Sequence, residues 1–341
     1  MSRAATAAGV VPATEEWFLH HGLSYFVPEQ RHAAREALRP RRLVPILLLV
    51  ALAAAGAGGA LAWLADQLAV GPAVLVSLSL AAAVLYALTA LNAGPIVRWA
   101  LSQTFGSLRT LLPMTTRALP LLLLFITFLF INTEVWMVAA ALDGPVMWLT
   151  VLLFSVVAVA FLLVRLPEEL DSSDDHVDLA QLRRACRGTP LEDEVEGLIG
   201  EDGRVSLPDS EVRGYERANL VLVLLVAQVV QVVVLALAVF AFFMVFGSIV
   251  MKHSVQEAWT GGRIHALPVA DNLSVELVQV SIFLAAFSGL YFTVTVLTDD
   301  TYRAQFFTGA MSELDQAVGV RAAYLALRGR EGRDEVSPHS P

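Results

Sequence analysis

The pattern of hydrophobic positions divides the chain into long apolar stretches separated by polar connectors. A bilayer core about 30 Å thick requires about 20 apolar helical residues to cross it. Six stretches meet this length, at residues 43–65, 70–91, 118–142, 145–164, 219–251 and 273–297. The pattern therefore predicts an all-α fold, a polytopic six-helix transmembrane bundle that carries short cytoplasmic amphipathic helices.

The polar segments around these stretches complete the expected organisation. In the N-terminal arm, Thr14 is expected to cap a first helix, and Pro28 to begin a second one that ends before Pro40. The first span follows about 40 mostly polar residues, which favours an uncleaved span over a signal peptide. The expected units are an arm with aromatic and arginine-rich helices (1–42), helices 1–4 (43–165), an acidic cytoplasmic helical loop (166–217), helices 5–6 with an outer loop at 252–272 (218–298), a cytoplasmic helix (299–328) and a disordered tail (329–341).

Composition supports a membrane protein and gives no indication of a nucleic-acid partner. Of the 341 residues, 56% are hydrophobic and 16% charged, whereas soluble domains carry about 25% charged residues. The formal net charge of −9 gives no indication of nucleic-acid binding. The single cysteine, Cys186, cannot form an intrachain disulfide and leaves no cysteine-based zinc site. The partner that composition predicts is the lipid bilayer.

The basic residues predict how the chain is oriented. With six alternating spans and a cytoplasmic N-terminus, 21 of the 23 basic residues fall in cytoplasmic segments. Only Lys252 and Arg263 fall in outer loops. Because cytoplasmic loops carry an excess of Lys and Arg, we expect a multi-pass protein of the cytoplasmic membrane with both termini inside.

Small residues recur at four-residue spacing in the first two spans. Such spacing lets helix backbones approach closely in lipid. It predicts a tight hairpin between these spans, with a dimer contact as the alternative. The pairs are Ala53 and Ala57, Ala55 and Gly59, Gly56 and Ala60, and Ser77 and Ala81.

Aromatic and apolar residues also mark the two cytoplasmic ends of the chain. In the arm, aromatic rings at headgroup level and arginines on anionic lipid are one interpretation; packing against the protein's own cytoplasmic face is the other. The rings belong to Trp17, Phe18, Tyr25 and Phe26. After residue 299, a heptad-like stripe indicates a helix that either forms a coiled coil or docks on the acidic loop. The stripe consists of Ala304, Phe307, Met311, Leu314, Val318, Arg321 and Leu325, and Arg321 is its one charged member.

The candidate polar site lies within the spans. Glu134 is the one carboxylate well inside a predicted span, and a charge at that depth is costly unless it faces water or a partner. One interpretation is a proton- or cation-exchanging carboxylate. The other is a neutral glutamate that hydrogen-bonds another helix, or a glutamate close enough to the outer interface to reach water. Its candidate partners are Gln228 and Gln231 on one face of the fifth span, and Ser281, Ser288 and Tyr291 in the sixth. The serines belong to a stripe with Ser274 and Thr295, which can line a hydrated path or act as interhelical hydrogen-bonding contacts.

The sequence contains no motif for catalysis or cofactor binding. GxxxxGK(S/T), GxGxxG, HExxH and GxSxG are all absent. The outer loop holds His253, Glu257, His265 and Asp271, but their spacing matches no metal-ligand pattern. No catalytic residue, cofactor or metal site is therefore expected.

Two segments carry a resemblance. EEWFLHHGLSYFVPEQR (15–31) and LTDDTYRAQFF (297–307) resemble uncharacterised integral membrane proteins of GC-rich Gram-positive bacteria. The resemblance covers about 28 residues and implies a compartment but no activity. The functional hypothesis is a non-catalytic membrane scaffold or regulatory subunit, with a second copy or another membrane protein as partner. The alternative is a proton- or ion-coupled transporter or channel that uses Glu134 and the polar faces of helices 5 and 6.

Overall fold

The structure is a computed structural model in which every named element is a helix. It describes all residues except 1, 172–178, 199–211, 269–271, 299–314 and 330–341, and it omits the side chains of 2–8, 104–121, 168–171, 179, 198 and 296–298. The predicted all-α fold is confirmed. Within the described residues, extended backbone pairs only at an isolated bridge between Ala266 and Ser274. Nearly all of the expected disordered tail lies outside the described residues.

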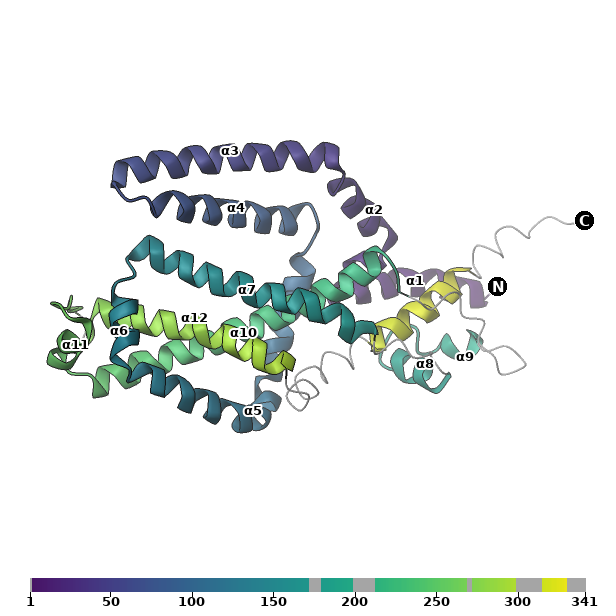
Figure 1. Cartoon of the computed structure of the whole chain (residues 1–341). Coiled ribbons are helices and arrows are strands. Elements are labelled where there is room, and N and C mark those ends of the chain that lie inside the picture. Colours follow the sequence, from purple (N-terminus) through teal and green to yellow (C-terminus); the bar gives the residue numbers. More distant parts are fainter. Residues whose placement is uncertain (1, 172–178, 199–211, 269–271, 299–314, 330–341) are drawn as a thin grey trace, which may run out of the picture.

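Five helices are long and apolar enough to cross a membrane, and a bent pair supplies a sixth crossing if it counts as one span. The five are α3 (Pro40–Ala65), α4 (Val70–Thr89), α7 (Gly144–Asp171), α10 (Tyr215–Val250) and α12 (Val275–Thr298). In Figure 1, α7, α10 and α12 form a central bundle, and the α3–α4 hairpin stands beside it. This arrangement is consistent with a multi-pass membrane protein.

The third predicted span is broken rather than continuous. α5 (Gly94–Phe130) ends where α6 (Thr133–Ala140) begins, and the two axes differ by 73°. The Asn132 side chain caps α6 by accepting hydrogen bonds from the backbone N–H groups of the next turn. Trp136 Nε1 donates to the Phe130 carbonyl at 2.7 Å, which satisfies an acceptor left free at the end of α5. The stretch 118–142 is therefore an elbow of two helices.

The tight hairpin predicted for the first two spans is confirmed. α3 and α4 approach most closely at Gly58, where a Cβ atom would lie 2.7 Å from the Gly71 carbonyl oxygen. The buried small residues of α3 are Ala54 and Gly58. The pairs singled out by spacing lie mostly on the other faces of α3, and Gly56 and Gly59 have no neighbouring atom within 4 Å of an added Cβ.

Helices from both ends of the chain and from the loop between α7 and α10 assemble into one unit, here called the head. It consists of α1 (Ser2–His20), η1 (Ser24–Phe26), α2 (Pro28–Ala37), α8 (Leu179–Cys186), α9 (Val195–Leu198) and the helix over residues 315–329. Apart from α2, which packs against η1, these elements share a buried core with α7 and the beginning of α10. In this core Phe18, Leu182, Leu191 and Tyr324 are at most 1% exposed. Since α10 has 36 residues and is about 54 Å long, it extends beyond a 30 Å hydrocarbon core into the head.

The head decides between the alternatives for the aromatic arm. Phe18, Tyr25 and Phe26 are buried, so these rings pack against the protein itself. The expected cap at Thr14 is wrong: Thr14 lies inside α1, and its hydroxyl donates to the Val10 carbonyl at 2.8 Å. Local sequence cannot distinguish a capping hydroxyl from one that bonds back to the preceding turn.

The C-terminal helix, over residues 315–329, packs against the other helices of the head. A Cβ atom at Gly319 would meet Ala185 of α8, so the described part of this helix packs against the acidic loop. Tyr324 makes an edge contact with Phe18 at 5.6 Å between ring centroids. The first four positions of the predicted stripe, 304–314, lie outside the described residues.

The opposite end of the bundle is closed by α11 (His253–Thr260), which packs against α6 and α12. Beneath it lies a second core, in which Phe130, Trp136, Phe243 and Leu277 have no exposed surface. The Phe130 and Phe243 rings stack at 4.7 Å. Aromatic side chains therefore fill the half of the space between α5, α10 and α12 that is nearer α11.

Candidate functional site

Glu134 lies at the elbow and not in the middle of a span. It is exposed on the first turn of α6, and its backbone N–H donates to Asn132 Oδ1 at 2.7 Å. A carboxylate in the first turn of a helix interacts favourably with the helix dipole. This position gives Glu134 a local structural role at the N-terminus of α6.

Gln228 and Gln231 lie in the half of α10 nearer the head. Gln228 is completely buried, and neither of its side-chain polar atoms has a hydrogen-bond partner in the described structure. The same is true of Gln231 Oε1. Gln228 precedes Val250, the end of α10, by 22 residues, or about 33 Å of helix. Phe130, at the elbow that carries Glu134, stacks on Phe243, which follows Gln228 by 15 residues or about 22 Å of helix. Glu134 is therefore distant from this pair.

The predicted serine positions are buried against α10. Ser288 Oγ donates to the Leu284 carbonyl, and Ser281 Oγ is buried with no partner among the described residues. Tyr291 stacks on Phe125 of α5, with ring centroids 5.1 Å apart. A Cβ atom at Gly289 would lie 3.1 Å from Val232 Cγ1, so α10 and α12 pack closely at this level. No hydrogen bond joins these α12 residues to Gln228 or Gln231 among the described residues, and Gly247 lies against Leu277, which places Ser281 toward the α11 end of the bundle, away from Gln228.

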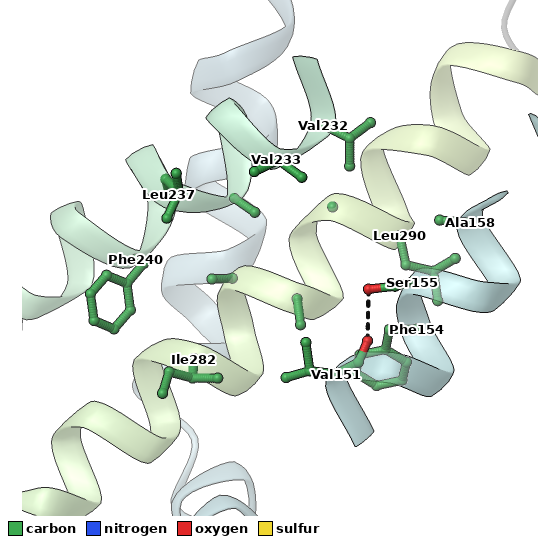
Figure 2. Close-up of a pocket in the computed structure, with 14 residues that line it drawn as sticks. Val151, Phe154, Ser155, Ala158, Val232, Val233, Leu237, Phe240, Ile282 and Leu290 are labelled. Carbon is green, nitrogen blue, oxygen red and sulfur yellow. Dashed lines mark hydrogen bonds between the residues drawn. The ribbon is translucent and has the colours of Figure 1, made fainter. Parts of the chain in front are cut away.

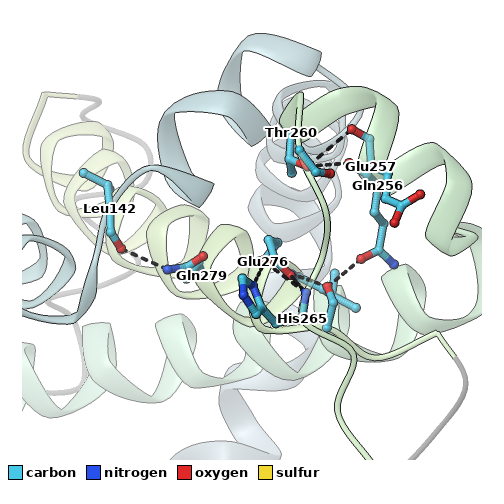
Figure 3. Close-up of polar contacts among 10 residues, drawn as sticks. Leu142, Gln256, Glu257, Thr260, His265, Glu276 and Gln279 are labelled. Atoms are coloured by element: carbon cyan, nitrogen blue, oxygen red, sulfur yellow. Dashed lines mark hydrogen bonds and ion pairs between the residues drawn. The ribbon is translucent and has the colours of Figure 1, made fainter.

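The outer loop is held by a separate polar cluster (Figure 3). Glu276, in the first turn of α12, accepts the backbone N–H of His265 at 3.1 Å and His265 Nδ1 at 2.8 Å. Ser274 donates to Gln256 Oε1, and Gln256 Nε2 donates to the carbonyls of Met251 and Asn272. No group of three or more potential metal ligands comes together in the described part of the chain. Asp271 lies outside it.

A buried ion cluster joins the head to α10, and sequence reasoning missed it. Glu216 is 4% exposed and bonds Arg321 on the C-terminal helix, with Arg321 Nη2 at 2.7 Å from Glu216 Oε2. On its other side, Arg31 Nη1 of α2 lies 2.9 Å from Glu216 Oε1. These three residues are called the Glu216 clasp. The available signal was Arg321, whose charge interrupts an apolar stripe.

Further polar contacts extend the clasp along α10. One turn after Glu216, Asn219 Oδ1 accepts the backbone N–H of Tyr25, and Asn219 Nδ2 donates to the Gly22 carbonyl at 2.9 Å. Tyr324 donates to Glu15 Oε1 at 2.5 Å. Burial, and then the neighbouring Glu15 carboxylate, raises the pKa of Tyr324, which keeps this hydroxyl a donor. The first turns of α10 therefore hold both terminal segments.

An apolar groove lies between α7, α10 and α12 (Figure 2). Its volume is about 340 Å³. Every lining side chain is apolar except Ser155, whose hydroxyl donates to the Val151 carbonyl within α7 at 2.8 Å. The lining residues are Val151, Phe154, Ser155, Ala158, Val232, Val233, Ala236, Leu237, Phe240, Ile282, Ala285, Ala286, Gly289 and Leu290.

Cys186 provides a reporter for the folded head. It is 1% exposed, and burial raises the pKa of its thiol to about 11. Because only the thiolate reacts readily, we expect N-ethylmaleimide at about pH 7.5 to leave the folded protein unlabelled and to label it fully in denaturant. The rate should rise as pH approaches the raised pKa. Mass spectrometry measures the adduct, and rapid stoichiometric labelling of the folded protein would contradict the prediction.

Comparison with known proteins found none that is similar to this chain. The chain matches no protein-family model, no curated protein sequence and no solved structure. The function is therefore argued from the site itself.

Proposed function

We propose that this protein is a non-catalytic scaffold or regulatory subunit of the cytoplasmic membrane. In this proposal the head lies on the cytoplasmic side and binds a membrane or peripheral protein partner. The distribution of arginines supports this orientation. It is also supported by the gathering of α1, α8 and the helix over 315–329 at one end of the bundle.

The Glu216 clasp is the observation that carries the proposal. It joins α2, α10 and the C-terminal helix, which are far apart in the sequence, through ion pairs of 2.7 to 2.9 Å. Buried ion pairs contribute little net stability but penalise alternative arrangements. Here they hold the head in one orientation on a transmembrane helix. A fixed orientation is what a protein needs when it presents a binding surface or passes on a change in a partner.

The transporter hypothesis is the second candidate, and Gln228 is the observation in its favour. A buried amide with no hydrogen-bond partner among the described residues is expensive, and a polar species that moves along α10 would offer it one. The position of Glu134 argues against a shared path, because this carboxylate lies at the outer elbow. Phe130, two residues before the Asn132 cap, is stacked on Phe243 in a buried apolar core, which offers no polar groups to such a path.

Site-specific photo-crosslinking in cells tests the proposed role. A photoreactive amino acid replaces Arg183 on the head, whose side chain is 54% exposed, or Leu49 on α3, which is 71% exposed. We expect a protein adduct of defined mass from at least one position. We expect the head adduct to disappear when Glu216→Gln opens the clasp and to persist in Leu153→Ala, a lipid-facing control on α7.

Two results would overturn the proposal. One is a bare monomer by native mass spectrometry of membrane vesicles, with no protein adduct at either position. The other is proton or ion flux in proteoliposomes that Glu134→Gln abolishes, which would establish the transporter alternative.

A further inference from the structure

The groove between α7, α10 and α12 lies halfway along each of the three helices. On α7 it spans residues 151–158 of a candidate crossing at Gly144–Pro167. On α12 it spans residues 282–290 of one at Val275–Thr295. In a bilayer this depth contains only hydrocarbon. A ligand that enters from the side is therefore apolar.

The chemistry of the lining agrees with this location. The Ser155 hydroxyl, the one polar side-chain group in the groove, is engaged by the Val151 carbonyl. A water molecule needs two to four polar partners to occupy a cavity, and this lining does not supply them. The groove therefore selects hydrocarbon over water or any hydrogen-bonding ligand.

The shape of the groove favours a chain over a helix. Its lining includes small residues, among them Ala236, Ala286 and Gly289, and larger ones such as Phe240 and Leu290. Phe154, which lines the groove, packs on Phe283 of α12, with ring centroids 5.8 Å apart. A helix is about 10–12 Å wide with its side chains, and a cavity of about 340 Å³ does not admit one.

We propose that this groove binds one acyl chain of a membrane lipid and that the bound chain completes the packing of α7, α10 and α12. The site does not depend on the proposed scaffold role. Van der Waals contact in a well-fitted cavity is what distinguishes such a chain from the surrounding lipid, since lipid tails and side chains are equally apolar.

Photolabelling tests the site on the full-length protein. The probe is phosphatidylglycerol with a diazirine at the end of one acyl chain, in vesicles of phosphatidylethanolamine and phosphatidylglycerol. We expect the label to concentrate in peptides that contain 151–158, 232–240 and 282–290, about tenfold above the lipid-facing residues of α3. We expect Ala286→Phe, which fills the groove, to remove this excess.

The matched control is Ala238→Phe, an exposed alanine of α10 that does not line the groove. It should leave the labelling pattern unchanged. If Ala286→Phe does not give a monodisperse protein, Ala236→Phe fills the groove from α10, and the distribution of label in the unmodified protein is decisive by itself. Even labelling of all lipid-facing helices would overturn the proposal. Strong labelling of the groove in reconstituted vesicles but not in cell membranes would also overturn it, because a protein partner would then occupy the groove in cells.

Discussion

Replacing Glu216 by glutamine is expected to lower the free energy of unfolding of the head by about 3 kcal/mol. Glutamine keeps the shape of the side chain but removes the charge that compensates Arg321, which is 8% exposed. The main cost is the loss of the two charge-assisted contacts that the Glu216 carboxylate makes with this buried guanidinium. Arg31 adds less, because about a third of its side chain reaches solvent. Unfolding is measured by a urea titration in nanodiscs, in which maleimide labelling of Cys186 reports the unfolded fraction of the head.

Two further variants make this prediction specific. Glu196 pairs with Arg183 at 3.0 Å, but both side chains are more than half exposed. Exposed pairs contribute about 0–1 kcal/mol, so Glu196→Gln should leave the urea midpoint almost unchanged. The double variant Glu216→Leu with Arg321→Leu should be more stable than Glu216→Leu alone, because it removes both buried charges. Equal midpoints for Glu216→Gln and Glu196→Gln would show that the clasp does not hold the head.

The fold was predictable from the sequence wherever burial in lipid sets the pattern. Long apolar runs identify α3, α4, α7, α10 and α12 because a helix that crosses hydrocarbon needs about 20 predominantly apolar residues. The interruption at Asn132 was not predictable in this way. Asn132 is one polar residue in an apolar stretch, and whether it caps a new helix depends on contacts such as the one from Trp136 to Phe130.

The candidate site shows the same limit. The depth of Glu134 was counted along an unbroken span, and the elbow moves it to the start of α6. Gln228 and Gln231 do share buried surroundings, as their spacing on one helix face indicates. Whether they form a functional site stays a prediction.

The Glu216 clasp was out of reach because its partners are distant in the chain. Glu216 and Arg321 are separated by 105 positions. A single sequence shows that Arg321 is out of place in an apolar stripe, but it does not show which acid faces it. The same reason explains why spacing predicted the α3–α4 hairpin but not its contact residues. Many alanine and glycine pairs on α3 share the spacing, and the orientation of the helix selects Ala54 and Gly58.

The close contact between α3 and α4 at Gly58 gives a second prediction with a large effect. Gly58→Ala is expected to force α3 and α4 apart, because the new Cβ would lie 2.7 Å from the Gly71 carbonyl oxygen. A backbone carbonyl cannot rotate away as a side chain can, and overpacking of this kind costs about 1–3 kcal/mol. Gly59→Ala is the matched control, since nothing lies within 4 Å of its Cβ position. In that variant the better helix propensity of alanine should leave the hairpin unchanged or slightly more stable.

Disulfide trapping measures the separation of the two helices directly. A Cβ atom at Gly71 would lie 3.6 Å from Ala62 Cβ, within the range of about 3.5–4.5 Å found in disulfides. With Ala62→Cys and Gly71→Cys on a Cys186→Ser background, oxidation should link α3 to α4 rapidly. Adding Gly58→Ala should slow this linkage by about tenfold, as expected for the loss of about 1.4 kcal/mol of close approach, and Gly59→Ala should not. Equal rates in the two variants would mean that the hairpin is not held at Gly58, and that the close approach of these backbones is not what positions α3 beside the bundle.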